Sequence, residues 1–213
     1  MKMTTKDQTQ KLYRFAFCLS LFTIFYNIAE GIISTYLGYE DESLALFGFG
    51  IDSFIEVVSG LGIAHMILRI QKKSNSERDN FERQSLQITG LCFYLLVIGI
   101  LSSSLFNIYT QHKPITTFWG MVISTLSIVI MWALKTGKSN IGKSLNSHAI
   151  IADANCTKVC LYISILLLLS STIYHLTRFP YIDSIGALGI AYFAFNEGRE
   201  CFEKIKKSHR SCE

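Results

Sequence analysis

The chain has 213 residues, of which half are hydrophobic, and it carries a formal net charge of +4 and only two prolines. Apolar stretches fill so much of this length that no room is left for a soluble domain of ordinary size. A positive charge can indicate nucleic-acid binding. Here we attribute it to basic loops between membrane helices, and we expect no nucleic-acid partner.

Six apolar stretches are close to the length of about 20 residues that a helix needs to cross roughly 30 Å of hydrocarbon. They cover residues 15–38, 43–68, 86–109, 115–134, 148–173 and 180–198. The sequence therefore predicts an all-α membrane protein with six transmembrane helices over residues 15–198. We expect residues 1–14 to form an N-terminal tail with no removable signal peptide, and residues 199–213 to form a short basic tail.

Basic residues gather on one side of these predicted helices. They precede the first helix and follow the second, fourth and sixth, and the group after the fourth is Lys135, Lys138 and Lys143. The positive-inside rule then places both termini in the cytoplasm, which requires an even number of helices. None of the six cysteines lies in a predicted outward loop. We therefore expect reduced thiols rather than a disulfide framework.

Two acids, Asp52 and Glu56, lie four residues apart in the second predicted helix, on one face and about 6 Å apart along its axis. A carboxylate at mid-membrane costs about 2.5–3.5 kcal/mol on insertion scales, so such groups usually have a function. Two neighbouring anions repel, and a divalent cation or a shared proton relieves that repulsion. The alternative is that both acids face a water-filled vestibule or pair with lysines.

The fifth predicted helix carries Asp153, and its face continues through Thr157 and Cys160. This helix runs antiparallel to the second, so its acid can meet Asp52 and Glu56 near mid-membrane. These three acids are the predicted metal site. Thr157 either supplies an oxygen or bonds back to its own helix. Cys160 is either a thiolate ligand, as its neighbour Cys156 can also be, or a small packing residue, which is the simpler interpretation.

Further polar residues are candidate ligands or proton relays. These residues are Glu30, Asp183 and His148. The structural alternative is solvation for Glu30, a helix cap for Asp183, and an entry-vestibule or interfacial position for His148. Asn27 in the first helix has the same candidate role. Lys158 lies deep in the fifth helix on a different face from Asp153. We expect it to snorkel, to pair with an acid or to sit in a cavity.

The stretch Gly137–Ser144 matches the phosphate-loop pattern G-x-x-x-x-G-K-[ST], but an apolar helix precedes it instead of a strand. We therefore expect no nucleotide partner. No catalytic triad, zinc-protease or haem motif occurs in the sequence, so the protein is not expected to be an enzyme. Without ATP hydrolysis, an ion gradient or the membrane potential would have to drive any transport.

These residues together resemble the transmembrane domain of the cation diffusion facilitator family. Its D-x-x-x-D element corresponds to Asp52-Ser-Phe-Ile-Glu56, and the acid of its H-x-x-x-D element corresponds to Asp153. Residues 26–31 resemble the family's first helix more weakly, and residues 183–191 and 197–200 resemble the start and the end of its sixth helix. Two departures stand out: Ala149 occupies the histidine position, and the chain ends soon after the sixth helix. The resemblance is therefore to a divergent branch, expected to lack the C-terminal cytoplasmic domain.

The resemblance implies export of a divalent cation, commonly Zn²⁺, from the cytoplasm in exchange for protons. Carboxylate oxygens are hard ligands, so Mn²⁺, Fe²⁺ and Co²⁺ are candidate substrates beside Zn²⁺. The metal would be cargo, and no prosthetic group is expected. We further expect a homodimer formed by membrane helices, embedded in the bilayer of the cell membrane. The alternatives are a proton-coupled exporter of organic cations and a metal-sensing membrane protein that does not transport.

Overall fold

The computed structural model describes residues 3–70, 78–110, 115, 117–145, 147–179 and 181–210, and every element in these ranges is an α-helix. A helix satisfies all of its own backbone hydrogen bonds, which is why long apolar segments adopt it in lipid. The all-α prediction is therefore confirmed for these ranges. The helices are α1 (Met3–Glu40), α2 (Leu44–Ile70), α3 (Arg78–Thr110), α4 (Phe118–Ser144), α5 (His148–Thr177) and α6 (Ile182–Arg210).

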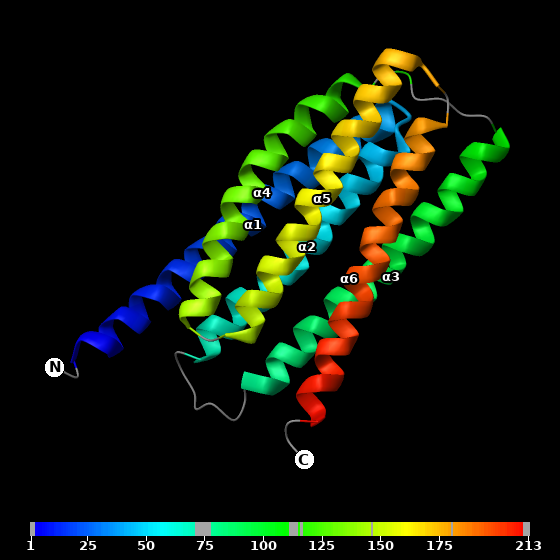
Figure 1. Cartoon of the computed structure of the whole chain (residues 1–213). Helices are drawn as coiled ribbons and strands as arrows, with labels where there is room; N and C mark the ends of the chain where they lie inside the picture. Colours follow the sequence, from blue (N-terminus) through cyan, green and yellow to red (C-terminus); the bar gives the residue numbers. More distant parts are fainter. Residues whose placement is uncertain are drawn as a thin grey trace.

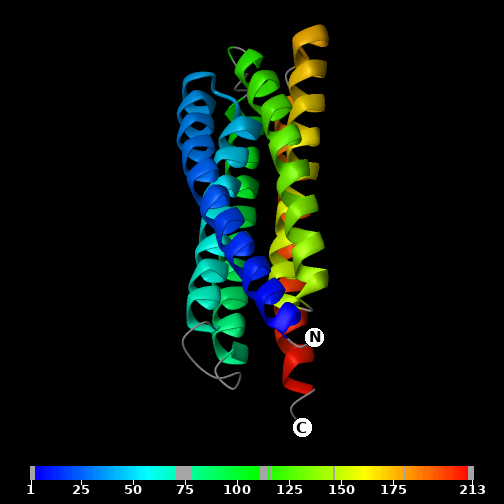
Figure 2. The same cartoon turned by 90° about the vertical axis from the view of Figure 1, so that its left-hand side faces the viewer.

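The helices form two layers, with α1, α2 and α3 in one and α4, α5 and α6 in the other (Figure 2). Across the interface α1 packs on α4, α2 on α5, and α3 on α6. Successive helices run in opposite directions, so both chain ends lie at the same end of the bundle (Figure 1). This arrangement agrees with the predicted topology, and the cytoplasmic placement of that end stays a prediction.

Within the described residues, four helical segments are long and apolar enough to cross a membrane: Thr9–Glu40, Leu44–His65, Phe118–Ser144 and Asp153–Thr177. A shorter apolar segment, Gly90–Phe106, lies in α3. Large apolar side chains such as Phe25 and Leu105 are also exposed on the outside of the bundle. Apolar surface on this scale indicates contact with lipid. These features make the chain a multi-pass membrane protein, while the number of six spans stays a prediction.

The fourth helix extends further than the sequence analysis predicted. α4 ends at Ser144 instead of near residue 134, so the stretch that matches the phosphate-loop pattern is helical. The prediction that Lys138 belongs to a cytoplasmic loop is wrong, because this residue lies within α4 with 2% of its side chain exposed. At the other end of the chain, residues 3–14 belong to α1.

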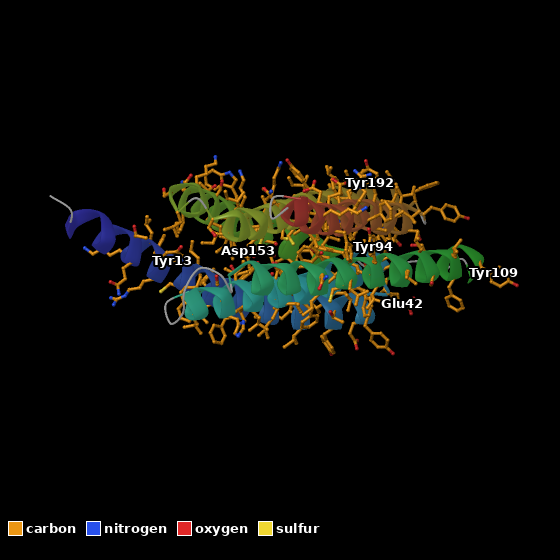
Figure 3. The ribbon with its side chains drawn as sticks, turned by 90° about the horizontal axis from the view of Figure 1, so that it is seen from below. Tyr13, Glu42, Tyr94, Tyr109, Asp153 and Tyr192 are labelled. Atoms are coloured by element: carbon orange, nitrogen blue, oxygen red, sulfur yellow. The ribbon has the colours of Figure 1, made fainter. Side chains whose placement is uncertain are left out.

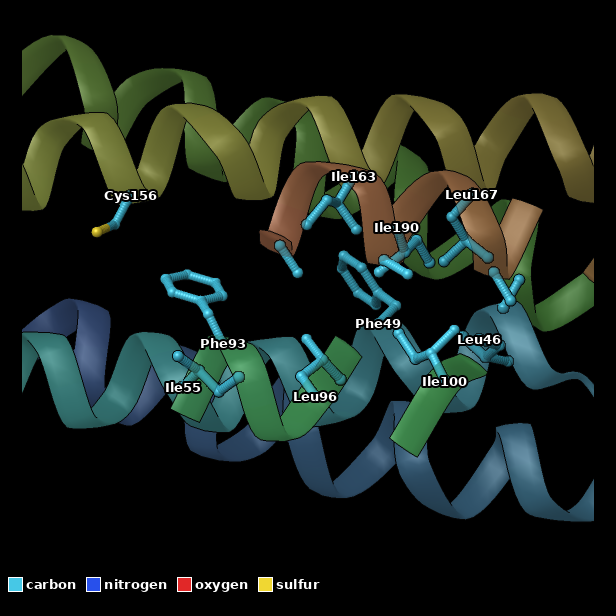
Figure 4. Packing of buried hydrophobic residues seen from close by; sticks show 14 residues of the cluster. Leu46, Phe49, Ile55, Phe93, Leu96, Ile100, Cys156, Ile163, Leu167 and Ile190 are labelled. Carbon is cyan, nitrogen blue, oxygen red and sulfur yellow. The ribbon is translucent and has the colours of Figure 1, made fainter. Parts of the chain in front are cut away.

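The main apolar core lies where α2 and α3 face α5 and α6. Phe49 and Ile55 from α2, Phe93 from α3, and Ile163 and Ile190 from α5 and α6 meet there (Figure 4). All of them are buried. Burying each such side chain contributes about 1.5–3 kcal/mol relative to leaving it in water. In lipid the close packing itself becomes the stabilising term, because the surrounding solvent is also apolar.

Two glycines bring α1 and α2 into close contact, Gly38 from α1 and Gly50 from α2. A Cβ atom at Gly38 would lie 2.5 Å from the backbone nitrogen of Phe47. One at Gly50 would lie 2.6 Å from the backbone nitrogen of Thr35. Backbone atoms cannot move aside as a flexible side chain can. The small residues therefore set the separation of the two helices, as small residues commonly do in membrane bundles.

We expect Gly38→Ala to destabilise the protein by about 1–3 kcal/mol, because the added methyl group forces α1 and α2 apart. Gly99→Ala is the matched control, since a Cβ atom at Gly99 meets no atom within 4 Å. The control is expected to be neutral or slightly stabilising, because alanine favours a helix over glycine. Thermal unfolding in detergent compares the two variants. Equal unfolding temperatures would contradict the close contact.

Candidate cation-binding site

Two polar faces meet where α2 packs on α5. Their residues recur at the i, i+4 and i+7 spacing of one helix face, and the helices are antiparallel, so the two series pair in reverse order. Three hydrogen bonds follow from this register: the Cys160 thiol donates to Asp52 Oδ2 (3.0 Å), the Thr157 hydroxyl to Glu56 Oε1, and the Ser59 hydroxyl to Asp153 Oδ1 (3.2 Å). All six residues are buried. In Figure 3, Asp153 lies between the two layers of helices, whereas Tyr109 and Tyr192 point away from the bundle.

The structure shows the contacts of two residues of the fifth helix, Thr157 and Cys160. The single proton of the Thr157 hydroxyl is shared between two acceptors, the backbone oxygen of Asp153 on its own helix (3.2 Å) and Glu56 Oε1 across the interface. Cys160 packs with Met131 and Leu134, as expected of a small packing residue, and its thiol also donates a hydrogen bond to the carboxylate of Asp52. Both side chains therefore belong to the polar site, and their role as ligands stays a prediction.

A lysine that the sequence analysis assigned to a loop lies within this site. The ammonium group of Lys138 in α4 is 3.0 Å from Asp153 Oδ2 and 3.8 Å from Glu56 Oε1, and it donates to Thr157 Oγ1 at 2.9 Å. A signal for its burial was present in the sequence. Ser127, Met131, Leu134 and Lys138 share one face of α4 at helical spacing, and all four are buried.

Two carboxylate oxygens in the site, Asp52 Oδ1 and Glu56 Oε2, are buried and have no hydrogen-bond partner among the described residues. A buried acceptor without a partner costs about 1–3 kcal/mol, and more when it is charged. A cation or a proton would satisfy both oxygens. Across the described part of the chain, no three histidine, cysteine, aspartate or glutamate side chains lie close enough together to hold a metal ion. The assignment of Asp52, Glu56 and Asp153 as ligands therefore stays a prediction.

The polar network extends from Ser53, next to Asp52, to the first helix. Glu30 in α1 accepts hydrogen bonds from the Tyr26 hydroxyl (2.7 Å) and the Ser53 hydroxyl (3.1 Å). The idea that Glu30 is only solvated is wrong, because it is 6% exposed. Asn27 is also buried, and its amide donates to the backbone oxygen of Thr23 (3.0 Å).

The second cysteine on α5 faces a different helix. The thiol of Cys156 lies 3.6 Å from Glu197 Oε1 on α6, and the side chain also packs into the main apolar core. Cys156 and Cys160 thus point to different carboxylates. Cys18, Cys92, Cys156, Cys160 and Cys201 are free thiols, and Cys212 lies outside the described residues.

Asp183 has a structural role at the end of the bundle opposite the chain termini. Its carboxylate accepts hydrogen bonds from the Ser43 hydroxyl (2.6 Å) and from the backbone nitrogens of Leu44 (2.7 Å) and Ala45 (3.3 Å). From its position in the sequence, Asp183 is expected to cap its own helix. It instead caps the start of α2 from α6, because an anion is favourable beside the free N–H groups of a helix N-terminus.

We expect Asp183→Ala to destabilise the protein by about 1–2 kcal/mol, because the first N–H groups of α2 lose their acceptor. Asp183→Asn is the matched control and should lose less, since an amide oxygen still accepts a hydrogen bond. Thermal unfolding in detergent measures both variants. Faster hydrogen exchange at Leu44 and Ala45 in the alanine variant would locate the effect. Identical unfolding of Asp183→Ala and the parent protein would contradict the cap.

The remaining candidates lie apart from the site or beyond the described side chains. Lys158 is exposed, and its ammonium lies 5.5 Å from the centroid of the Tyr162 ring. It therefore lies on the surface of α5 over the ring of Tyr162 and does not enter the site, and snorkelling stays a prediction. The backbones of His148 and Ala149 begin α5, and their side chains lie outside the described part of the structure.

The buried carboxylates, the polar contact between α2 and α5 and the apolar exterior define a membrane protein with ionisable groups in its interior. Comparison with known proteins gives the family. Residues 15–206 match the cation efflux transmembrane domain, and the chain belongs to this family of cation transporters. It is also 28% identical over 149 residues to Transmembrane protein 163 of Xenopus laevis. That alignment covers 70% of this chain and 51% of the relative, so the chain spans about half the length of the curated relative it matches.

Proposed function

We propose that this protein is a secondary transporter that exports a divalent metal cation from the cytoplasm in exchange for protons. Asp52, Glu56 and Asp153 bind the cation, and Zn²⁺ is the first candidate. The observation that carries this proposal is the pair of buried, unpartnered oxygens on Asp52 and Glu56 in a chain of the cation efflux family. Buried carboxylate oxygens without a partner add nothing to the stability of the fold, and a transported cation would give them a partner.

Exchange for protons follows from the chemistry of the ligands. A carboxylate binds metal only when it is deprotonated, so metal and protons compete for the same oxygens. Metal that enters from the cytoplasm would release protons from the site. Protons that enter from the opposite side would then release the metal. Alternation of the site between the two sides couples the two flows without ATP.

The donor set favours Zn²⁺ over harder ions. Asp52 and Glu56 supply oxygen, and the Cys160 thiol lies 3.0 Å from Asp52 Oδ2. A thiolate beside a carboxylate suits Zn²⁺ better than Mn²⁺, which prefers oxygen ligands alone. Thr157 is a further oxygen donor next to Glu56.

We also propose that the protein forms a homodimer through its membrane helices and lies in the cell membrane.

The test is uptake of divalent cations into proteoliposomes that contain the purified protein and an imposed pH gradient. Zn²⁺ uptake should exceed that of Mn²⁺, Fe²⁺ and Co²⁺, and it should fall when the gradient is collapsed. Asp52→Ala combined with Asp153→Ala should abolish it. Transport that survives this double substitution would overturn the proposal. Metal binding without flux would instead favour a sensor.

One observation favours a second candidate function, export of organic amines. The site already holds the ammonium of Lys138 against Asp153 at 3.0 Å. A site that accommodates this ammonium has the chemistry to bind a lipophilic amine. Proton release stimulated by a lipophilic tertiary amine, without release stimulated by metal, would support this function over metal export.

A further inference from the structure

We propose that Lys138 is a tethered cation that fills the substrate position between Glu56 and Asp153 and leaves it when a divalent cation binds. The inference rests on the proposed function and goes beyond it. It assigns a specificity-determining role to a residue outside the predicted ligand set. The sequence alone predicts this lysine among the loop charges.

The geometry supports substitution for a bound ion. The ammonium of Lys138 contacts oxygens from two helices: Asp153 Oδ2 (3.0 Å) and Thr157 Oγ1 (2.9 Å) on α5, and Glu56 Oε1 (3.8 Å) on α2. A metal cation held by Glu56 and Asp153 would take the same central position. The lysine itself belongs to α4, so it closes the site from outside the α2–α5 pair.

The charges explain why the ammonium and a metal exclude each other. Two positive ions within about 4 Å in a buried site repel strongly, because little solvent screens them. Glu56 and Asp153 are the two carboxylates that the ammonium contacts, and a metal bound by both of them would need the same oxygens. Asp52, the third acid of the proposed site, forms no ion pair with Lys138 in the described part of the chain. The lysine therefore has to move when metal enters. Its flexible stem of four methylene groups allows that movement, since the head group can snorkel away from the site.

This arrangement has a consequence for ion selection. The lysine lowers the net negative charge of the site by one, so a monovalent cation gains little by displacing it. A divalent cation gains about twice the attraction to the same carboxylates. Lys138 thus makes the site selective for divalent ions while it keeps the substrate-free carboxylates paired.

The test compares Zn²⁺ binding by the full-length protein and its variants, measured by isothermal titration calorimetry in detergent. Lys138→Met keeps the stem and removes the competing charge, so it should bind Zn²⁺ at least about tenfold more tightly. Lys138→Arg keeps the charge and should bind no more tightly than the parent protein. Lys135→Met is the matched control, because Lys135 lies three residues earlier on α4 and is only partly buried. Affinity of Lys138→Met equal to or weaker than the parent would overturn the proposal.

A measurement on the unaltered protein keeps the proposal testable if Lys138→Met does not fold. Reductive methylation followed by mass spectrometry reports how accessible each lysine is. Zn²⁺ should raise the labelling of Lys138 several-fold, with Lys135 as the internal reference. Unchanged labelling at saturating Zn²⁺ would overturn the proposal. If the unaltered protein binds no divalent cation, the proposed function fails as well. If it binds Zn²⁺ and Lys138 responds in neither experiment, only this inference fails.

Discussion

Asp52→Asn should reduce Zn²⁺ uptake into proteoliposomes at least about hundredfold. The asparagine has nearly the same shape but lacks the negative charge that attracts the cation. Altering a group that only supports a metal ligand commonly costs about 10–100-fold in affinity, and loss of an anionic ligand should cost more. Asp52 is buried, and one of its two oxygens has no partner among the described residues, so the substitution should disturb packing little.

The matched control for this prediction is Glu203→Gln on α6. Glu203 is 54% exposed and forms an ion pair with Arg199 on the same surface (3.4 Å). Exposed pairs of this kind contribute about 0–1 kcal/mol, so the control should fold and transport normally. Normal uptake by Asp52→Asn, or an equal loss in the control, would contradict the assignment of Asp52 as a ligand.

The second large effect concerns stability without metal. Lys138→Met should destabilise the metal-free protein by about 3–5 kcal/mol, because it leaves the carboxylates of Glu56 and Asp153 buried without their ion-pair partner. Thermal unfolding in detergent with a chelator measures this loss. Saturating Zn²⁺ should restore most of the stability, since the metal replaces the lost positive charge.

A double substitution separates the ion pair from simple packing. Asp153→Asn removes one of the two negative charges, so adding it to Lys138→Met should recover part of the lost stability. Removing both partners of a buried pair commonly costs less than removing one. The single and double variants form a cycle whose coupling energy measures the pair. Losses that simply add would contradict a direct ion pair between Lys138 and Asp153.

Much of the site could be predicted from helical periodicity. The spacing of Asp52 and Glu56 placed both on one face, and the spacing of Asp153, Thr157 and Cys160 placed these on another. The structure joins the two faces in that register. Local spacing is sufficient here because each set lies on one regular helix. The contact between the sets follows from the antiparallel direction of α2 and α5.

What the sequence could not give were contacts between residues far apart in the chain. Asp183 caps α2 from a position 140 residues beyond Ser43, and no local pattern predicts such a partner. Glu30 looked solvated from its place near a helix end, but Tyr26 and Ser53 enclose it. Lys138 was misassigned because the positive-inside rule treats a lysine near a span as a loop charge. The partner that makes its burial tolerable, Asp153, lies on another helix.

The most direct test of the account is metal-dependent proton release by the purified protein in weakly buffered detergent solution. We predict that Zn²⁺ releases protons from the unaltered protein. The release should be lost in the variant that carries both Asp52→Asn and Asp153→Asn. Absence of proton release with Zn²⁺, Mn²⁺, Fe²⁺ and Co²⁺ alike, or release of equal size from the double variant, would contradict a carboxylate site that exchanges metal for protons.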